Sequence, residues 1–158
     1  MAKMIDEKPS FKGEGKVWDK LNEYLPSDMV VYNQREINGR EYDFCVMAEN
    51  LGIVVIEVKG WLAERIIVNG VDNIDVEGYE KPQTSPKKQA RAYRFAILNK
   101  ISEKYNVSPL VLDMVCYPFI SKAEYESSRL DIVSEEQYTI FKEDLEDCER
   151  LNNQCFSS

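Results

Sequence analysis

The chain has 158 residues, of which 44% are hydrophobic and 30% are charged, and its formal net charge is -8. This length favours one hydrophobic core over two, because domains usually contain about 100 to 200 residues. The acidic balance argues against a protein that coats a polyanion over a wide surface, but it leaves room for a local binding site.

Histidine is absent from the sequence. Its absence excludes Ser-His-Asp and Cys-His nucleophiles, histidine-ligated zinc and histidine general bases in this chain. Any chemistry must therefore run on carboxylates, lysine, hydroxyl groups or a hard metal ion.

The sequence also bears on cellular location. No apolar run approaches the roughly 18 residues of a membrane-spanning helix, and the charged segment 1–15 lacks the features of a secretory signal. No C-x-x-C pair occurs, so we expect four reduced thiols at Cys45, Cys116, Cys148 and Cys155. These features predict a cytoplasmic protein without a membrane partner.

The first half of the chain predicts one helix and three strands. Residues 14–25 place apolar side chains at helical spacing, and Pro26 ends the segment. Three β-rich runs follow, separated by turn residues at Asn38-Gly39 and Asn50-Leu51-Gly52, and they predict an antiparallel meander with strands at 29–36, 42–49 and 53–61.

The second half predicts a hairpin, two helices and one strand. Residues 61–83 suggest an exposed hairpin or irregular excursion, with one short apolar run at Ile66 to Val68. Pro86 suits the first turn of a helix from Lys87 to Tyr105. Residues 110–120 predict a buried strand, and a last helix is expected over about 134–150, with Glu136 to Gln137 near the capping-box position. With no internal boundary in sight, residues 1–158 are expected to form one domain, with its core at about 11–120.

Charge is unevenly distributed along the chain. The stretch from Lys81 to Lys104 is basic apart from Glu103, whereas Glu124 to Arg150 is strongly acidic. The basic helix is a candidate phosphate-facing surface, and a solvated helix face is the alternative. The candidate nucleic-acid contacts on it are Lys87, Lys88, Arg91 and Arg94.

One strand combines an acid and a base with an apolar run. In the segment 53–59, Glu57 and Lys59 lie two residues apart, so both project from one face of the strand. Burying unpaired charges costs several kcal/mol or more, so such a pair needs partners or a ligand. This is the first indication of a site.

Asp43 can join this pair through the preceding turn. A three-residue loop at 50–52, with Gly52 in the left-handed conformation, pairs Asp43 with Lys59 and puts Glu57 on the same face. A four-residue loop would put Asp43 on the opposite face, and a bulge would be needed to recover the site.

This group suits a hard metal ion. Mg²⁺ prefers oxygen ligands, so Asp43, Glu57 and the carbonyl of Val58 could hold it, and Lys59 could orient water or neutralise charge on a phosphate. The alternative is a surface cluster of cross-strand ion pairs, worth a few tenths of a kcal/mol.

Four motifs follow one another along the chain: Gly13-Glu14-Gly15, Glu41-Tyr42-Asp43, Gly52-Ile53-x-x-Ile56-Glu57-Val58-Lys59-Gly60-Trp61 and Ser85-Pro86-x-x-Gln89. In this order they resemble the nuclease-related domain (NERD) family, which is grouped with the PD-(D/E)XK nuclease superfamily. The resemblance implies an α/β fold with a restriction-endonuclease-like core, a mixed β-sheet flanked by helices in the order αβββαβ. The element order expected above is the same.

The resemblance also implies roles for individual residues. Asp43 and Glu57 match the metal carboxylates of the superfamily, and Lys59 matches its motif lysine. Glu14 matches the acidic residue on the first helix, which could add a ligand through water. The alternative for Glu14 is a carboxylate favoured by the helix dipole.

Two further residues match the second helix of the family. Gln89 follows the proline as it does in the family, and Gln89-x-x-x-Tyr93 resembles the helix motif of the RecB-like branch. At i and i+4 both side chains share a helix face and could reach the metal or a substrate. Core packing is the alternative for Tyr93.

The combined expectation is a Mg²⁺- or Mn²⁺-dependent nuclease that hydrolyses phosphodiester bonds in DNA processing, on DNA rather than RNA. One alternative is a catalytically silent module of the same fold that binds nucleic acid or protein, as the N-terminal part of a larger helicase-type protein. Another is an interaction domain that uses the acidic C-terminal helix. A homodimer and a fused or partner helicase both remain open.

Overall fold

The computed structural model describes residues 1–37, 39–49, 52–106 and 109–156. Within these ranges the main sheet has six strands. Strands β2, β3 and β4 are antiparallel neighbours, and β8 runs parallel to β4. The spatial order is β1 (Lys3–Met4), β2 (Met29–Ile37), β3 (Arg40–Ala48), β4 (Gly52–Val58), β8 (Val111–Cys116) and β9 (Thr139–Ile140).

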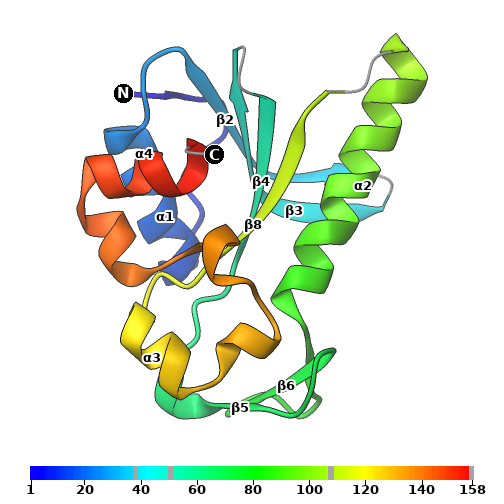
Figure 1. The fold of residues 1–158 in the computed structure, drawn as a ribbon. Coiled ribbons are helices and arrows are strands. Elements are labelled where there is room, and N and C mark those ends of the chain that lie inside the picture. Colours follow the sequence, from blue (N-terminus) through cyan, green and yellow to red (C-terminus); the bar gives the residue numbers. More distant parts are fainter. Residues whose placement is uncertain (38, 50–51, 107–108, 157–158) are drawn as a thin grey trace.

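Helices cover both faces of this sheet. Helices α1 (Lys12–Tyr24) and α4 (Cys148–Phe156) lie on one side, and the long helix α2 (Pro86–Tyr105) lies on the other (Figure 1). The predicted order αβββαβ corresponds to α1, β2, β3, β4, α2 and β8. The predicted α/β class with a restriction-endonuclease-like core is therefore confirmed.

The two long helices begin close to the predicted residues. Helix α2 starts at Pro86, and the Ser85 side chain accepts a hydrogen bond from the Lys88 N–H. Serine caps an otherwise unpaired backbone donor there, and proline lacks one, so this pair fixes the helix start. Helix α1 begins at Lys12, two residues before the predicted start, and ends at Tyr24.

The predicted hairpin register was wrong by two residues. Cys45 lies opposite Val55 and Phe44 opposite Ile56, so Asp43 is not opposite Lys59. Gly52, at φ +112°, belongs to β4, where a Cβ would lie 2.5 Å from the carbonyl oxygen of Leu110. Side chains alternate with period two, so the even shift keeps Asp43 on the predicted face.

The turn predictions fall partly on residues without a described structure. Asn38, Asn50 and Leu51 lie outside the described residues. Gly39 has φ +79°, a left-handed conformation that glycine adopts at little cost, and it immediately precedes β3.

Residues 61–83 contain the predicted hairpin. Strands β5 (Ile66–Val68) and β6 (Asn73–Val76) are antiparallel neighbours, and β7 (Gln83–Thr84) extends them to a small sheet, preceded by the 3-10 turn Ala63–Arg65. Most residues of this segment are exposed, as predicted. Ile74 is fully buried in a cluster that includes Trp61 and Tyr117, so the inner face of the small sheet packs on the domain.

The predicted helix over 134–150 was wrong. This region contains the 3-10 turns Glu136–Tyr138 and Lys142–Glu146 on either side of β9, and α4 begins only at Cys148. Thr139, Ile140 and Phe141 are buried, and β9 pairs in parallel with β8. Burial of these β-forming residues overrides the local helical pattern.

A further helix in this region was not predicted. Helix α3 (Lys122–Ser127) begins at a capping box in which Ser121 and Glu124 exchange hydrogen bonds. The 3-10 turn Leu130–Ile132 follows it. Acidic side chains are therefore spread over several short elements, and they do not form the single acidic helix that the interaction-domain alternative requires.

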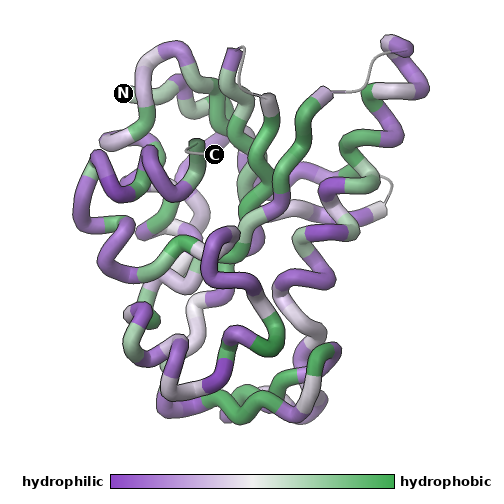
Figure 2. Tube along the Cα trace, in the orientation of Figure 1, coloured by the Kyte–Doolittle hydropathy of each residue, from purple (hydrophilic) through white to green (hydrophobic). Residues whose placement is uncertain are grey.

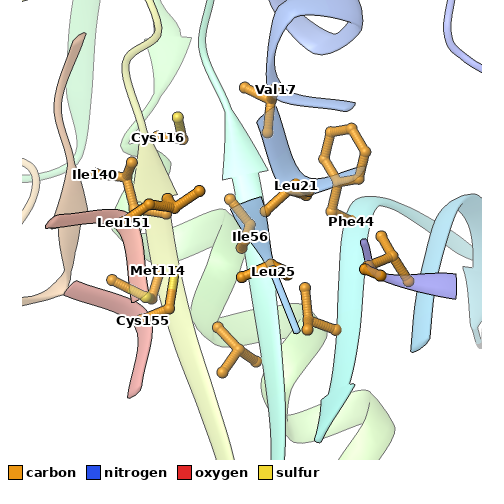
Figure 3. Close-up of a cluster of buried hydrophobic side chains, with 14 of the residues drawn as sticks. Val17, Leu21, Leu25, Phe44, Ile56, Met114, Cys116, Ile140, Leu151 and Cys155 are labelled. Atoms are coloured by element: carbon orange, nitrogen blue, oxygen red, sulfur yellow. The ribbon is translucent and has the colours of Figure 1, made fainter. Parts of the chain in front are cut away.

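The core has one layer on each face of the sheet. Under α1 and α4, Leu21, Phe44, Ile56, Met114 and Leu151 interlock (Figure 3). Leu21, Val54, Ile56, Val111 and Val115 are buried. Trp18 is half-buried, and its Nε1 donates to the Asp6 carbonyl, 3.2 Å away.

Hydrophobic residues concentrate in the central strands, and hydrophilic ones follow the outer turns and helices (Figure 2). All four cysteines are free thiols, as predicted, and Cys148 is the exposed one. Among the described residues, no helix has the combined length and apolar character needed to cross a membrane.

Candidate active site

Asp43 is held at the point where two central strands separate. The pairing of β3 with β4 ends at Phe44 and Ile56. Beyond it, Asp43 Oδ2 accepts a 2.7 Å hydrogen bond from the backbone N–H of Val58. The Asp43 side chain thus accepts a hydrogen bond that a backbone carbonyl of the neighbouring strand would otherwise accept. This hydrogen bond fixes the Asp43 carboxyl group beside the end of β4.

Glu57 and Lys59 lie next to this carboxyl group. Glu57 Oε1 is 3.2 Å from Lys59 Nζ, and the Glu57 side chain is only 6% exposed. The Lys59 ammonium lies 5.6 Å from the Trp61 ring centroid, over its face. The negative charge of Asp43 is near enough to raise the pKa of the Glu57 carboxyl group. The structure therefore brings together the three residues predicted at the centre of the site.

Among the described residues, two buried oxygen atoms of residues predicted for the site have no hydrogen-bond partner. They are Glu57 Oε2 and Gln89 Oε1. A buried acceptor without a partner costs about 1 to 3 kcal/mol, and more if it is charged. Both atoms are acceptors, so the missing partner is a hydrogen-bond donor or a cation.

Glu14 extends the acidic group from α1. Burial, with the nearby Asp43 charge as a second cause, raises the pKa of the Glu14 carboxyl group to about 7. Burial also raises the pKa of Asp43, opposed by the Val58 N–H. The pKa of Glu57 rises through burial and then through the Asp43 charge. Three acids thus compete for positive charge in one place.

A close backbone contact positions Glu14. The Cα of Gly60 would lie 3.1 Å from a Cβ on Gly13, so a larger residue at position 13 would force α1 and the chain after β4 slightly apart. Gly13 is buried and directly precedes Glu14. The first turn of α1 is thereby held against the end of β4, next to Lys59.

Tyr93 lies near the carboxylates and also packs in the core. Burial, followed by the negative charges of Glu57 and Asp43, raises the pKa of Tyr93 to about 12. The same side chain packs against the buried cluster of Cys45 and Ile97 between the sheet and α2. Tyr93 is therefore both a core-packing residue and a neighbour of the carboxylates.

A cleft of about 640 Å³ opens beside Lys59. The start of α1 and the segment that follows β4 form part of its wall, and residues of the small sheet β5–β7 form another part. This small sheet lies below the end of β4 in Figure 1. The lining includes Phe11, Lys12, Glu14, Val58, Lys59, Trp61, Arg65, Tyr79, Gln83 and Phe119.

The donor set fits a hard cation with a mostly aqueous shell. Among the residues that the structure describes, no group of three or more Asp, Glu or Cys side chains is arranged to hold a metal. The carboxylates of Asp43 and Glu57 nevertheless match Mg²⁺ or Mn²⁺, which often keep several waters and use few protein ligands. The orphaned Oε2 of Glu57 is the observation that supports this fit.

The basic residues of α2 lie apart from this cluster. At 100° per residue, Lys87, Arg91 and Arg94 fall on the opposite flank of the helix from Gln89 and Tyr93. They line a second, smaller cavity beside β8. Three of the four predicted phosphate contacts already have acidic partners, in the ion pairs Lys87–Glu135, Lys88–Asp72 and Arg94–Asp113.

Sequence reasoning missed most of the cleft wall. Phe11, Arg65 and Tyr79 line the cleft but received no role in the sequence analysis, which treated 61–83 only as an exposed hairpin or irregular excursion. The available signal was an aromatic and a basic residue within twenty positions after Lys59. Nothing in the local pattern indicated that the small sheet folds back toward the end of β4.

Two comparisons with known proteins found matches to this chain. The nuclease-related domain family (NERD) matches residues 9–118. A repair endonuclease from Pyrococcus abyssi is similar in structure at 13% sequence identity and a TM-score of 0.41, over 85% of this chain and 48% of that one. The chain thus spans about half the length of that endonuclease. No curated protein shows a significant match. From the match over residues 9–118, the chain belongs to the nuclease-related domain family.

Proposed function

We propose that this chain is a divalent-metal-dependent nuclease that hydrolyses phosphodiester bonds of DNA. The observation that carries the proposal is Glu57, a buried carboxylate with one oxygen on Lys59 and the other without a partner. A buried charge left half-satisfied is costly, and sites of this kind commonly serve binding or catalysis. Membership in a nuclease-related family supports the same conclusion.

Each residue of the cluster has a distinct part in the proposal. Asp43 and Glu57 are the metal carboxylates, and Val58 and Gln89 supply neutral oxygens nearby. Glu14 can hold a water of the metal shell, because its raised pKa near 7 lets it accept or release a proton around neutral pH. The Val58 N–H keeps Asp43 oriented toward Glu57.

Lys59 is the proposed electrostatic residue. Its ammonium is held between Glu57 and the face of Trp61, at the wall of the cleft. From there it can orient the attacking water and neutralise charge that develops on the phosphate. A bound Mg²⁺ or Mn²⁺ would supply Lewis-acid activation of water and of the phosphate oxygen.

The proposal is tested by cleavage of labelled single-stranded and double-stranded DNA and RNA with Mg²⁺, Mn²⁺ or EDTA. We expect cleavage of DNA that requires the metal and is lost in Glu57→Gln. Glu103→Gln, which changes an acid on the distant part of α2, is the matched control and should cut like the wild type. Metal-independent cleavage, or equal cleavage by Glu57→Gln, would assign the activity to another site or to a contaminant.

The test also addresses the alternative of a silent binding module. If no substrate is cut with either metal while nucleic acid still binds, the fold serves recognition alone. Thermal stabilisation by Mn²⁺ provides a readout independent of turnover, because a ligand that binds only the folded state raises the melting temperature. We expect that stabilisation in the wild type and its loss in Glu57→Gln.

A further inference from the structure

The cleft beside Lys59 exposes two large aromatic rings. Phe11, directly before α1, is 70% exposed, and Tyr79, between β6 and β7, is 55% exposed. Both line the same cavity. A single exposed aromatic is ordinary on a protein surface, but exposed apolar groups gathered in a concave site usually indicate a binding function. Trp61 lines the cavity too, but at 6% exposure its ring is not open for stacking.

Two cations accompany these rings. Lys12 and Arg65 are exposed in the lining of the cleft, and within the described ranges neither forms an ion pair with an acidic side chain. Lys12 Nζ lies 5.6 Å from the Phe119 ring centroid, which keeps it at the cleft wall. On α2, by contrast, three of the predicted phosphate contacts are occupied by acids.

Aromatic faces together with unpaired cations form the combination that holds unpaired nucleotides. Bases stack on aromatic rings without regard to sequence, and cations track the phosphate backbone. Stacking requires an accessible base face, which a continuous duplex hides within its own stack. A groove that offers both ring faces and charges therefore favours single strands over duplexes.

We propose that this cleft binds single-stranded nucleic acid, with bases stacked on Phe11 and Tyr79 and with phosphates at Lys12 and Arg65. The inference rests on the proposed function, because the cleft leads to Lys59 and Glu14 of the same site. It adds the substrate class: unpaired strands, or unpaired ends and flaps of a duplex.

Binding can be measured without turnover. In EDTA, fluorescence anisotropy of a short labelled single strand is compared with that of the blunt duplex of the same sequence. We expect tighter binding of the single strand by the wild type. Phe11→Ala and Tyr79→Ala should each weaken single-strand binding by about 5-fold to 100-fold, the range found for loss of one base–aromatic stack. Duplex binding should change little.

Matched variants separate stacking from general surface effects. Phe11→Tyr and Tyr79→Phe keep an aromatic ring and should retain wild-type affinity. Phe95→Ala and Tyr105→Ala remove rings that are 50% and 62% exposed on α2, outside the cleft, and should also bind like the wild type.

Three results would overturn the inference. They are duplex binding as tight as single-strand binding, alanine variants that bind single strands like the wild type, and no single-strand binding by the wild type. The proposed nuclease function fails separately. If single strands bind through Phe11 and Tyr79 but no metal supports cleavage, the cleft assignment stands and the nuclease assignment falls. If duplexes are cut and the alanine variants act like the wild type, the nuclease assignment stands and the cleft assignment falls.

Discussion

Asp43 accepts a 2.7 Å hydrogen bond from the backbone N–H of Val58, just beyond the last pair that joins β3 to β4. This contact gives Asp43 a structural role in addition to its proposed metal role, and two substitutions separate them. Asp43→Asn retains an oxygen that can accept from Val58 but removes the charge. Asp43→Ala removes both.

We predict that metal-free Asp43→Asn is at least as stable as the wild type, because it removes a buried charge that repels Glu57. Asp43→Ala should lose about 1 to 3 kcal/mol, because it leaves the Val58 donor without a partner. Neither variant should gain the stabilisation by Mn²⁺ expected of the wild type. Chemical denaturation with and without Mn²⁺ measures both effects. Mn²⁺ stabilisation of Asp43→Asn equal to that of the wild type would remove Asp43 from the metal site.

The raised pKa of Glu14 predicts how stability depends on pH without metal. Its pKa rises from the ordinary value of 4.5 to about 7 in the fold, so the folded state favours the protonated carboxyl. This contribution is fully present below about pH 4.5 and is lost as the pH rises through about 7. In EDTA, the stability of the wild type relative to Glu14→Gln should therefore fall between pH 5 and pH 8. Parallel melting-temperature profiles of the two proteins would show that Glu14 is not so perturbed.

Because of the contact between Gly13 and Gly60, alanine at position 13 should lower the stability of the fold, contrary to its usual effect in a helix. Alanine normally stabilises a helix by about 1 kcal/mol relative to glycine. At Gly13 the added Cβ would meet the Gly60 Cα at 3.1 Å, so we expect Gly13→Ala to be destabilised by about 1 to 3 kcal/mol. It should also slow cleavage, because Glu14 moves with the helix.

Gly60→Ala provides the matched comparison on the other side of the same contact. Its Cβ would lie 3.6 Å from the Gly13 Cα, which is ordinary van der Waals contact. Its unfolding free energy should stay closer to that of the wild type than that of Gly13→Ala. If Gly13→Ala is more stable than the wild type, α1 is not pressed against the chain after β4 as described.

The core of the fold could be predicted because its patterns are local. The pair Ser85-Pro86 predicted the start of α2. The apolar run that leads to Glu57 and Lys59 predicted the central strand β4. The site also survived an error of two residues in the hairpin register. Period-two alternation preserves the face of Asp43 under any even shift.

The features that were not predicted depend on contacts distant in sequence. Residues 139–141 became strand and turn because they are buried against β8, whereas the local pattern had favoured a helix. The small sheet β5–β7 buries Ile74 against residues such as Tyr117, more than forty positions later. The helical periodicity of α2 was enough to show that its basic residues lie on the opposite flank from Gln89 and Tyr93. It could not show that Glu135 and Asp113 of β8 would pair with these basic residues.

Two basic surfaces now compete for the phosphate backbone. The proposal for α2 centres on Arg91, because its neighbours Lys87, Lys88 and Arg94 are paired with acids. We predict that Lys12→Glu with Arg65→Glu weakens single-strand binding more than Lys88→Glu with Arg91→Glu does. Loss of two phosphate contacts should lower the slope of log affinity against log salt by about 1.4. A larger change of slope in the α2 variant would show that the phosphate backbone of the nucleic acid lies along α2 instead.

The central claim is that Lys59 and two carboxylates form a metal-dependent catalytic site, and the most direct test compares wild type with Lys59→Ala in Mn²⁺. The substitution leaves Asp43 and Glu57 in place, so Mn²⁺ should still raise the melting temperature. The cleavage rate should fall about 10²-fold to 10³-fold, as for other electrostatic catalytic groups. Lys100→Ala, which removes an exposed lysine of α2, should cut like the wild type. If wild type and Lys59→Ala cut every substrate at the same rate, or neither cuts any, the catalytic assignment is contradicted.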